Sequence, residues 1–198
     1  LNLINEDYLK EEGQALQKQI PLPRGLSFGL LLGGNTKAFS LNAAVVAQVL
    51  SQIKRSVEKH EAKILASTSR RTPAGIENLL KQELKNYPRC GILVVASENN
   101  PSFAVGGILD LSKIIIVSPE SISMISEAAT CGKYIVVFKA RVGQRHAQFL
   151  GHLAAKNYIY LCRPDEISSL IDEILRKQPP IRILEDNLKV TEALRRII

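Results

Sequence analysis

The feature of this 198-residue chain that most constrains its fold is a strict alternation of short apolar runs with longer amphipathic segments. Six runs are rich in Ile, Val and Leu on both faces of an extended chain, which predicts strands of a parallel sheet covered on both sides. They are residues 27–32, 62–67, 91–96, 113–117, 133–138 and 158–162. The segments with helical spacing are 41–60, 73–86, 103–111, 121–131, 144–157 and 165–177. This alternation predicts a doubly wound, six-stranded, Rossmann-like α/β domain.

The predicted domain covers residues 25–180, and a segment flanks it on each side. Residues 1–24 combine a predicted helix over 5–19, capped by Asn5, with a linker that contains Pro21 and Pro23. Residues 181–198 follow Pro179-Pro180 and have the pattern of a basic amphipathic tail. The chain begins with Leu rather than Met, which suggests a fragment or a processed chain.

Composition limits the class of protein. With 45% hydrophobic and 23% charged residues, the chain has the make-up of a globular domain with a sizeable core. No apolar run reaches the roughly 18–20 residues that a membrane-spanning helix needs. Cys90, Cys131 and Cys162 form no close pair, so we expect reduced, packed thiols. These features predict a cytoplasmic protein, with peripheral contact to a membrane left open.

The net charge of +7 is unevenly distributed. Residues 128–164 contain six basic side chains and no acidic one. A basic face of this kind suits a phosphorylated ligand or an anionic membrane surface. Nucleic acid is not an expected partner, because the sequence has no zinc-ligand spacing and no helix-turn-helix signature, and aromatic residues make up only 5% of it.

The strongest functional signal lies between the fourth and fifth apolar runs, in Ser118–Ala128. Ser121 and Ser123 fall where helix 121–131 should begin, and free backbone N–H groups and the helix dipole attract anions there. Glu127 follows Ser123 by four residues and shares its helix face, so its carboxylate could accept hydrogen bonds from ribose hydroxyls. An ordinary capped helix with an exposed glutamate fits the same residues.

Topology predicts where this segment lies. In an open parallel sheet a ligand binds beyond the carboxyl ends of the strands where strand order reverses, which is between strands one and four in the order 3-2-1-4-5-6. Gly33-Gly34-Asn35-Thr36 follows the first run and should therefore adjoin Ser121, although a Gly pair also fits a plain tight turn. Polar and basic residues follow other runs at the same edge and favour a diphosphate-bearing ligand: Ser69, Arg70, Arg71, Lys139, Arg141 and Gln144.

Other kinds of site are not supported by the sequence. It lacks the G-x-G-x-x-G fingerprint and the P-loop, and no cofactor is expected. His146 and His152 are six residues apart, which is not the i, i+4 spacing of a helical metal pair, and we predict no metal site. No catalytic residue is predicted either, because no obvious base has a partner that could shift its pKa. Glu98 and Glu120 in particular have no identifiable partner in the sequence.

Four motifs taken together resemble the mitochondrial fission protein family that is named for elongated plant mitochondria. They are Gly33–Thr36, Ser67–Pro73, Asn100-Pro101, and Ser121–Ala128 followed by Thr130–Lys133. Glu120 stands where the family tends to have Asp, and Tyr134 stands where Pro is usual. Such proteins are predicted to be GT-B-like, with two Rossmann-like domains. The resemblance implies that this chain is the C-terminal, nucleotide-binding half and that its first helix is the interdomain connection.

Three functions follow from the resemblance. The favoured one is the nucleotide-sugar donor half of a glycosyltransferase, which is not catalytic without the missing N-terminal domain. Gly33, Gly34, Ser121, Ser123 and the Ser123-Met124 backbone would then contact phosphate, Arg70, Arg71 and Lys139 would supply charge, and Glu127 would hold the ribose. The alternatives are a non-catalytic adaptor that binds partners or membranes, and a nucleotide-sugar epimerase. The sequence leaves open whether the full-length protein is an enzyme.

Overall fold

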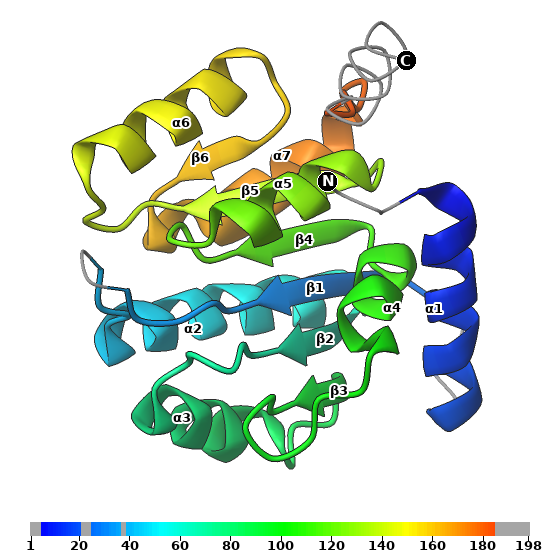
Figure 1. Ribbon diagram of the computed structural model, residues 1–198. Coiled ribbons are helices and arrows are strands. Elements are labelled where there is room, and N and C mark those ends of the chain that lie inside the picture. The colour runs from blue at the N-terminus through cyan, green and yellow to red at the C-terminus, as the bar shows by residue number, and fades with distance from the viewer. Residues whose placement is uncertain (1–4, 21–24, 37–38, 185–198) are drawn as a thin grey trace, which may run out of the picture.

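The computed structural model describes residues 5–20, 25–36 and 39–184. Six parallel strands form one sheet in the order β3-β2-β1-β4-β5-β6 (Figure 1). The strands are β1 (Ser27–Leu31), β2 (Lys63–Ser67), β3 (Cys90–Val94), β4 (Ile114–Val117), β5 (Tyr134–Phe138) and β6 (Tyr160–Cys162). The predicted doubly wound α/β fold and its strand order are confirmed.

Seven helices accompany the sheet within the described residues: α1 (Glu6–Gln19), α2 (Ala43–Lys59), α3 (Ala74–Leu84), α4 (Phe103–Leu111), α5 (Ile122–Thr130), α6 (Gln144–Ala155) and α7 (Ile167–Lys177). A short 3₁₀ turn, Pro164–Glu166, precedes α7. Asn5 caps α1 as predicted, because its side chain accepts a hydrogen bond from the Tyr8 N–H at 2.8 Å. Helix α2 begins two residues later than predicted, since the Asn42 side chain accepts hydrogen bonds from Ala44 N and Val45 N.

From the sequence, Pro73 suits a first helical turn with Thr72 as its cap, and Asp165 suits the cap of the last helix. Both predictions are wrong. Pro73 precedes α3 as its N-cap instead of lying in the first turn, and the Thr72 hydroxyl donates to the Gly33 carbonyl instead of capping the helix. Asp165 lies inside the 3₁₀ turn, where Glu166 accepts a hydrogen bond from the Arg163 N–H at 2.8 Å. The Thr72 hydroxyl is thus used in a long-range hydrogen bond, and Asp165 is part of a 3₁₀ turn that precedes α7. Neither residue caps a helix.

Helices cover both faces of the sheet (Figure 1). One core forms between the sheet and α2, α3 and α7, and a second forms between the sheet and α1, α4, α5 and α6. Side chains alternate between the two cores along β1, β2, β4 and β5, as the pleat requires. In β4, for example, Ile114 and Ile116 belong to the first core, and Ile115 and Val117 belong to the second. The strands are therefore apolar on both faces, as the sequence pattern indicated.

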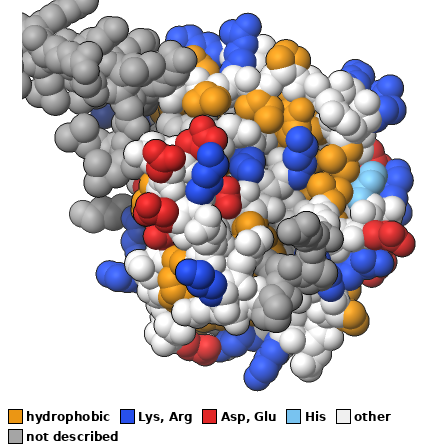
Figure 2. All heavy atoms as spheres, turned by 90° about the vertical axis from the view of Figure 1, so that its right-hand side faces the viewer, with side chains coloured by type: hydrophobic (Ala, Val, Ile, Leu, Met, Phe, Trp, Pro, Cys, Tyr) orange, Lys and Arg blue, Asp and Glu red, His pale blue; other side chains and the backbone are white. Residues whose placement is uncertain are grey.

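Helix α1 packs against α4 at the amino-end edge of the sheet (Figure 1). Leu9 and Leu16 are buried there, and Gly106 and Gly107 of α4 let the two helices approach closely. Figure 2 views this side of the molecule, where acidic and basic side chains are interleaved. The helix predicted over 5–19 is present, and its role as an interdomain connection stays a prediction. The predicted tail lies outside the described residues from residue 185 onward.

None of the helices in the described part of the chain is both long enough and apolar enough to span a membrane. The three cysteines are free thiols.

Candidate functional site

The loops that follow β1, β2 and β4 meet at one edge of the sheet. We call residues 32–36, 68–73 and 118–121 the switch-point loops. β1 pairs with β4 on one side and with β2 on the other, so the strand order reverses here. The Gly33 N–H donates to Ser118 Oγ at 2.8 Å, and the Ser118 N–H donates to the Leu31 carbonyl at 3.1 Å. The segment after β1 and the start of α5 are thus joined by hydrogen bonds, as the topology predicted.

Gly33 and Gly34 are required for space. A Cβ on Gly33 would overlap Glu120 Oε1, and a Cβ on Gly34 would overlap the Arg71 carbonyl. Neither glycine has a φ in the left-handed region, so the need for glycine here does not come from the tight turn that the Gly pair suggested. The Asn35 N–H donates to the same Arg71 carbonyl at 3.2 Å. The loops after β1 and β2 therefore pack backbone against backbone, whereas the loop after β4 packs the side chains of Glu120 and Ser121 against Gly33. Any side chain at these glycines would separate the loops.

Asn35 and Thr36 stabilise their own loop. Asn35 Oδ1 accepts a hydrogen bond from the Leu41 N–H at 2.9 Å. Thr36 forms an isolated antiparallel bridge with Phe39, with its N–H donating to the Phe39 carbonyl at 2.9 Å. Both side chains are exposed. The Asn35 carboxamide oxygen is thus already used within the loop.

Ser121 precedes α5 but does not cap it. The residue is buried, and within the described chain its side chain makes no capping hydrogen bond. The Ser121 carbonyl accepts the Ile125 N–H at 3.0 Å, which is the first hydrogen bond of the helix. The predicted start of α5 is confirmed, and the alternative of an ordinary helix capped by a serine side chain is not supported, because Ser121 makes no such hydrogen bond.

Ser123 and Glu127 lie on one face of α5, as predicted from their spacing. Ser123 Oγ donates to Glu127 Oε1 at 2.8 Å, and Ser123 is exposed. Burial, followed by the charges of Glu12 and Glu127, raises the pKa of Tyr8 on α1, so Glu127 acts electrostatically on α1. Met124 is half-buried and packs against the second core. Its side chain therefore has a packing role, and its backbone belongs to the first turn of α5.

The basic and polar candidates differ in how closely they approach the switch-point loops. Ser69 organises the loop after β2, because Ser69 Oγ accepts the Arg71 N–H at 3.2 Å. The Arg71 side chain is exposed, and its charge acts on Glu120. Arg70 is exposed in the same loop. Lys139 and Gln144 are also exposed, but they follow β5, which is separated from β1 by β4. The structure brings Gly33, Gly34, Arg71 and Ser121 together, and the other cations lie along the same edge.

Glu120 is the residue that the sequence analysis did not select. It is only 5% exposed and lies against Gly33, with Oε1 accepting a hydrogen bond from Ser118 Oγ at 2.9 Å. Oε2 is buried and has no hydrogen-bond partner among the described residues. Burial raises the pKa of the Glu120 carboxyl, although hydrogen bonds from its own backbone and Ser118 and the charge of Arg71 oppose that rise.

Glu120 thus has a partner that could not be identified from the sequence. Ser118 is two residues away in sequence, and the charge of Arg71 acts on Glu120 only because the fold brings the two loops together. An acidic residue two positions after a serine, just before the helix start, was the available signal.

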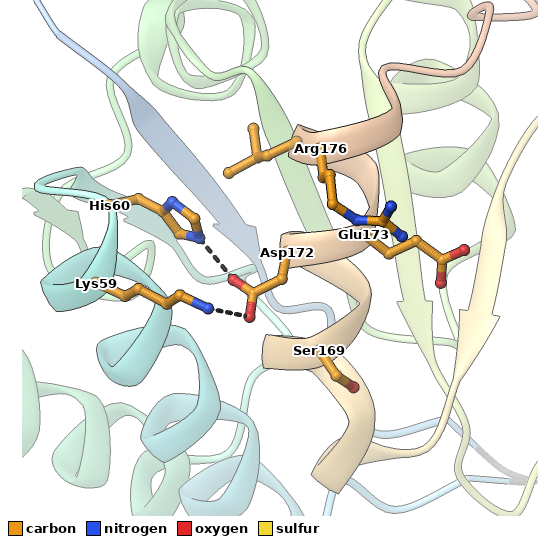
Figure 3. A pocket seen from close by; sticks show the side chains of 7 residues that line it. Lys59, His60, Ser169, Asp172, Glu173 and Arg176 are labelled. Carbon is orange, nitrogen blue, oxygen red and sulfur yellow. Dashed lines mark hydrogen bonds and ion pairs between the residues drawn. The ribbon is translucent and has the colours of Figure 1, made fainter.

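Two other groups of polar side chains lie away from the switch-point loops. His60 and Lys59, at the end of α2, both contact Asp172 of α7, at 2.6 and 2.7 Å (Figure 3). These residues line an open pocket, which lies at the other end of α2 from the switch-point loops (Figure 1).

Glu98, like Glu120, has a partner that the sequence did not reveal, because it forms an exposed ion pair with Lys81 at 2.7 Å. Across the described residues, no group of three or more His, Cys, Asp or Glu side chains could hold a metal ion.

Comparison with known sequences identifies one family and one curated relative. The sequence model of the family described as Mitochondrial fission ELM1 matches residues 1–196. Protein RP120 of Rickettsia prowazekii (strain Madrid E) is 30% identical over 128 residues, which cover 62% of this chain and 34% of that protein. The match thus spans about a third of the length of the curated relative.

Comparison with solved structures supports the fold. A Listeria monocytogenes protein described as a UDP-N-acetylglucosamine 2-epimerase has a TM-score of 0.55 at 11% identity, with 90% of this chain and 41% of that chain covered. The C-terminal domain of a glycosyl transferase group 1 family protein from Francisella tularensis has a TM-score of 0.52 at 13% identity, with 85% and 82% covered. An E. coli structure described as trehalose-6-phosphate bound with UDP-2-fluoro glucose also has a TM-score of 0.52, at 11% identity, with 88% and 43% covered. The chain has the fold of the C-terminal domain of a GT-B glycosyltransferase.

Proposed function

The chain belongs to the mitochondrial fission ELM1 family, and from that membership and the geometry of the switch-point loops we propose that it binds the diphosphate of a nucleotide sugar. In this proposal the chain is the donor half of a GT-B-like glycosyltransferase. Residues 25–180 form the nucleotide-binding domain, and residues 1–24 lead to it from an N-terminal domain that would supply the acceptor site.

The observation that carries the proposal is the uncapped start of α5 beside two closely packed glycines. The Ser121 side chain makes no capping hydrogen bond within the described chain, so the first-turn amides of α5 are available to an anion. Gly33 and Gly34 bring the three switch-point loops into close contact at that point. An oxygen-rich, negatively charged ligand would find backbone donors there, with the Arg71 guanidinium nearby.

Further residues fit the rest of a nucleotide sugar. Glu127 lies one to two turns into α5 and accepts a hydrogen bond from the Ser123 hydroxyl. A ribose hydroxyl could replace that partner, because a carboxylate accepts several hydrogen bonds. Arg70, Lys139 and Gln144 lie along the same edge and would complete the polar surroundings. A solved structure of this fold is described as bound with UDP-2-fluoro glucose, which makes a nucleotide sugar a natural ligand to test.

A thermal-shift screen of the 198-residue chain against UDP, GDP, ADP, CMP and their sugars tests the proposal. A ligand at 100 times its Kd should stabilise the fold by about 2.7 kcal/mol. Arg71→Ala should reduce that stabilisation, whereas Arg55→Ala, an exposed arginine on α2, should not. No stabilisation by any of these compounds would contradict the proposal and favour the non-catalytic adaptor. Equal stabilisation of the Arg71→Ala variant would place the diphosphate elsewhere.

A further inference from the structure

Glu120 places a carboxyl group where an anion is proposed to bind. Its Oε1 atom lies against the α-carbon of Gly33 and accepts the Ser118 hydroxyl at 2.9 Å. It is two residues before the first residue of α5. A carboxylate at this position would repel a diphosphate held by the same loops, since the low dielectric of a buried site strengthens like-charge repulsion. Binding an anion here therefore requires a way to remove the charge of Glu120.

The environment of Glu120 favours the neutral acid. The side chain is 5% exposed, and Oε2 has no hydrogen-bond partner among the described residues. Burying an ionised carboxylate with one oxygen unpaired costs more free energy than burying the neutral acid, because desolvation disfavours the charged form. The hydrogen bonds that favour the ionised form, from Ser118 and from the backbones of Glu120 and Gly34, are opposed by this burial. Arg71, in the loop after β2, acts on the carboxyl through its positive charge, which also favours the ionised form.

We infer that Glu120 is a proton-linked residue of the anion site, which takes up a proton when the diphosphate of a nucleotide sugar binds. The inference rests on the proposed function and deepens it. The neutral carboxyl admits the anion, and its ionised form disfavours it. The proton comes from solvent, so the bound complex holds one more proton than the free protein and ligand at pH values above the pKa of Glu120 in the free protein.

The consequence is a specific dependence of affinity on pH. Above the pKa of Glu120 in the free protein, affinity should fall by up to about tenfold per pH unit, because one proton is taken up per ligand. UDP-glucose, ADP-glucose and GDP-glucose are suitable probes, since their diphosphate diesters do not change charge between pH 5 and pH 8. The 198-residue chain is titrated with each of the three by calorimetry, in buffers of different ionisation heat, so that proton uptake is measured directly.

Variants separate Glu120 from other titrating groups. Glu120→Gln keeps the shape of the side chain without its charge, so it should bind with an affinity that no longer falls with pH and with no proton uptake. Glu98→Gln removes an exposed carboxylate that is ion-paired with Lys81 and should behave as the wild type. Nuclear magnetic resonance of carboxyl-labelled glutamate in the wild type gives the Glu120 pKa with and without the probe, even if the variant does not fold.

The outcomes distinguish this inference from the proposed function. Binding with proton uptake that disappears in Glu120→Gln, or a Glu120 pKa that rises with the probe, supports it. Binding with no proton uptake, or with uptake that persists in Glu120→Gln, overturns it and leaves the proposed function standing. If none of the three probes binds, the proposed function fails and this inference fails with it.

Discussion

Gly34 lies with its α-carbon against the main chain of Arg71 and Thr72. A Cβ at this position would lie 2.6 Å from Thr72 N and closer still to the Arg71 carbonyl. Both neighbours are backbone atoms, which cannot rotate away as a side chain can. The loop after β1 and the loop after β2 would therefore have to separate to admit even a methyl group.

We therefore expect Gly34→Ala to lower the free energy of unfolding by about 1–3 kcal/mol, the usual cost of overpacking. Gly75 is the matched control, because a Cβ added there meets nothing within 4 Å beyond its chain neighbours and the backbone of its own helix. Since Gly75 lies in α3, Gly75→Ala should be neutral or stabilise by up to about 1 kcal/mol. Urea unfolding of the two variants measures both effects. A Gly34→Ala variant as stable as the wild type would show that the two loops can separate freely.

The second prediction at the residue scale concerns acid and base stability. Burial holds the pKa of Glu120 above its ordinary value of 4.5, so the folded state binds its proton more tightly than the unfolded state does. Stability from this group is full below about pH 4.5 and is lost as pH rises through the folded-state pKa. In Glu120→Gln the free energy of unfolding should no longer show this decrease with rising pH, whereas in Glu98→Gln the decrease should persist. Urea unfolding across pH 4 to 8 is the measurement, and an identical pH profile in Glu120→Gln would contradict the assignment.

At the scale of elements, the contact between α1 and α4 depends on small residues. A Cβ on Gly107 would lie 2.7 Å from Leu16 Cβ and 3.0 Å from the Glu12 carbonyl, and one on Gly106 would meet the Glu12 side chain. Leu16 is fully buried against this surface. The helix that precedes the sheet is thus attached through an apolar, closely packed interface, and it forms part of the second core.

Gly107→Ala should loosen α1 and lower the free energy of unfolding by about 1–3 kcal/mol. Gly151→Ala in α6 is the control, because the added Cβ meets nothing within 4 Å beyond its chain neighbours and the backbone of its own helix. Hydrogen exchange of the Gly107→Ala variant distinguishes a loosened α1 from a local repacking of side chains. Faster exchange confined to α1 and α4 would confirm the packing role, whereas unchanged exchange in α1 would mean that Leu16 repacks around the methyl group.

The α2–α7 contact has a different physical basis. Asp172 accepts hydrogen bonds from Lys59 and His60 (Figure 3). Burial alone would raise the pKa of Asp172, but these hydrogen bonds and charges together lower it. The stabilisation is therefore present above the ordinary pKa of 3.8 and is lost as pH falls through the lower folded-state value. Because the side chains are partly exposed, we expect a contribution no larger than about 1 kcal/mol.

At the scale of the whole molecule, the polar groups are arranged for binding, and a base for glycosyl transfer is not evident among the described residues. Glu127 holds a serine hydroxyl, Glu98 is paired with Lys81, and Glu120 is buried. Transfer also requires an acceptor held in line with the donor. In the proposed arrangement that acceptor site belongs to the other domain.

We therefore expect the 198-residue chain to show no multiple-turnover transfer, even when it binds a nucleotide sugar. Incubation with UDP-, GDP- and ADP-sugars, with release of free nucleotide as the readout, tests this. Turnover that disappears in Glu98→Gln or Glu120→Gln would mean that the catalytic base is in this chain. The half-enzyme hypothesis would then be wrong.

The order of elements, and the edge of the sheet at which the loops after β1 and β4 meet, followed from the sequence alone. Apolar runs such as Ile114–Val117 can be recognised as strands from the sequence, because a parallel strand that is buried on both faces shows no alternation of apolar and polar residues. The position of Ser121 beside Gly33 followed as well, since a doubly wound sheet places the ends of its first and fourth strands together.

Only the tertiary structure decided which atoms meet at that edge. Gly34 and Arg71 are far apart in the chain, and they come into contact because β1 pairs with β2. The Thr72 hydroxyl, which local spacing assigned to a helix cap, is instead used by Gly33. Burial of Glu120 likewise requires β1, β4 and the loop after β2 to be assembled. Helix and strand patterns are local and can be predicted from residue spacing, whereas desolvation and the pKa that follows from it depend on neighbours that the fold supplies.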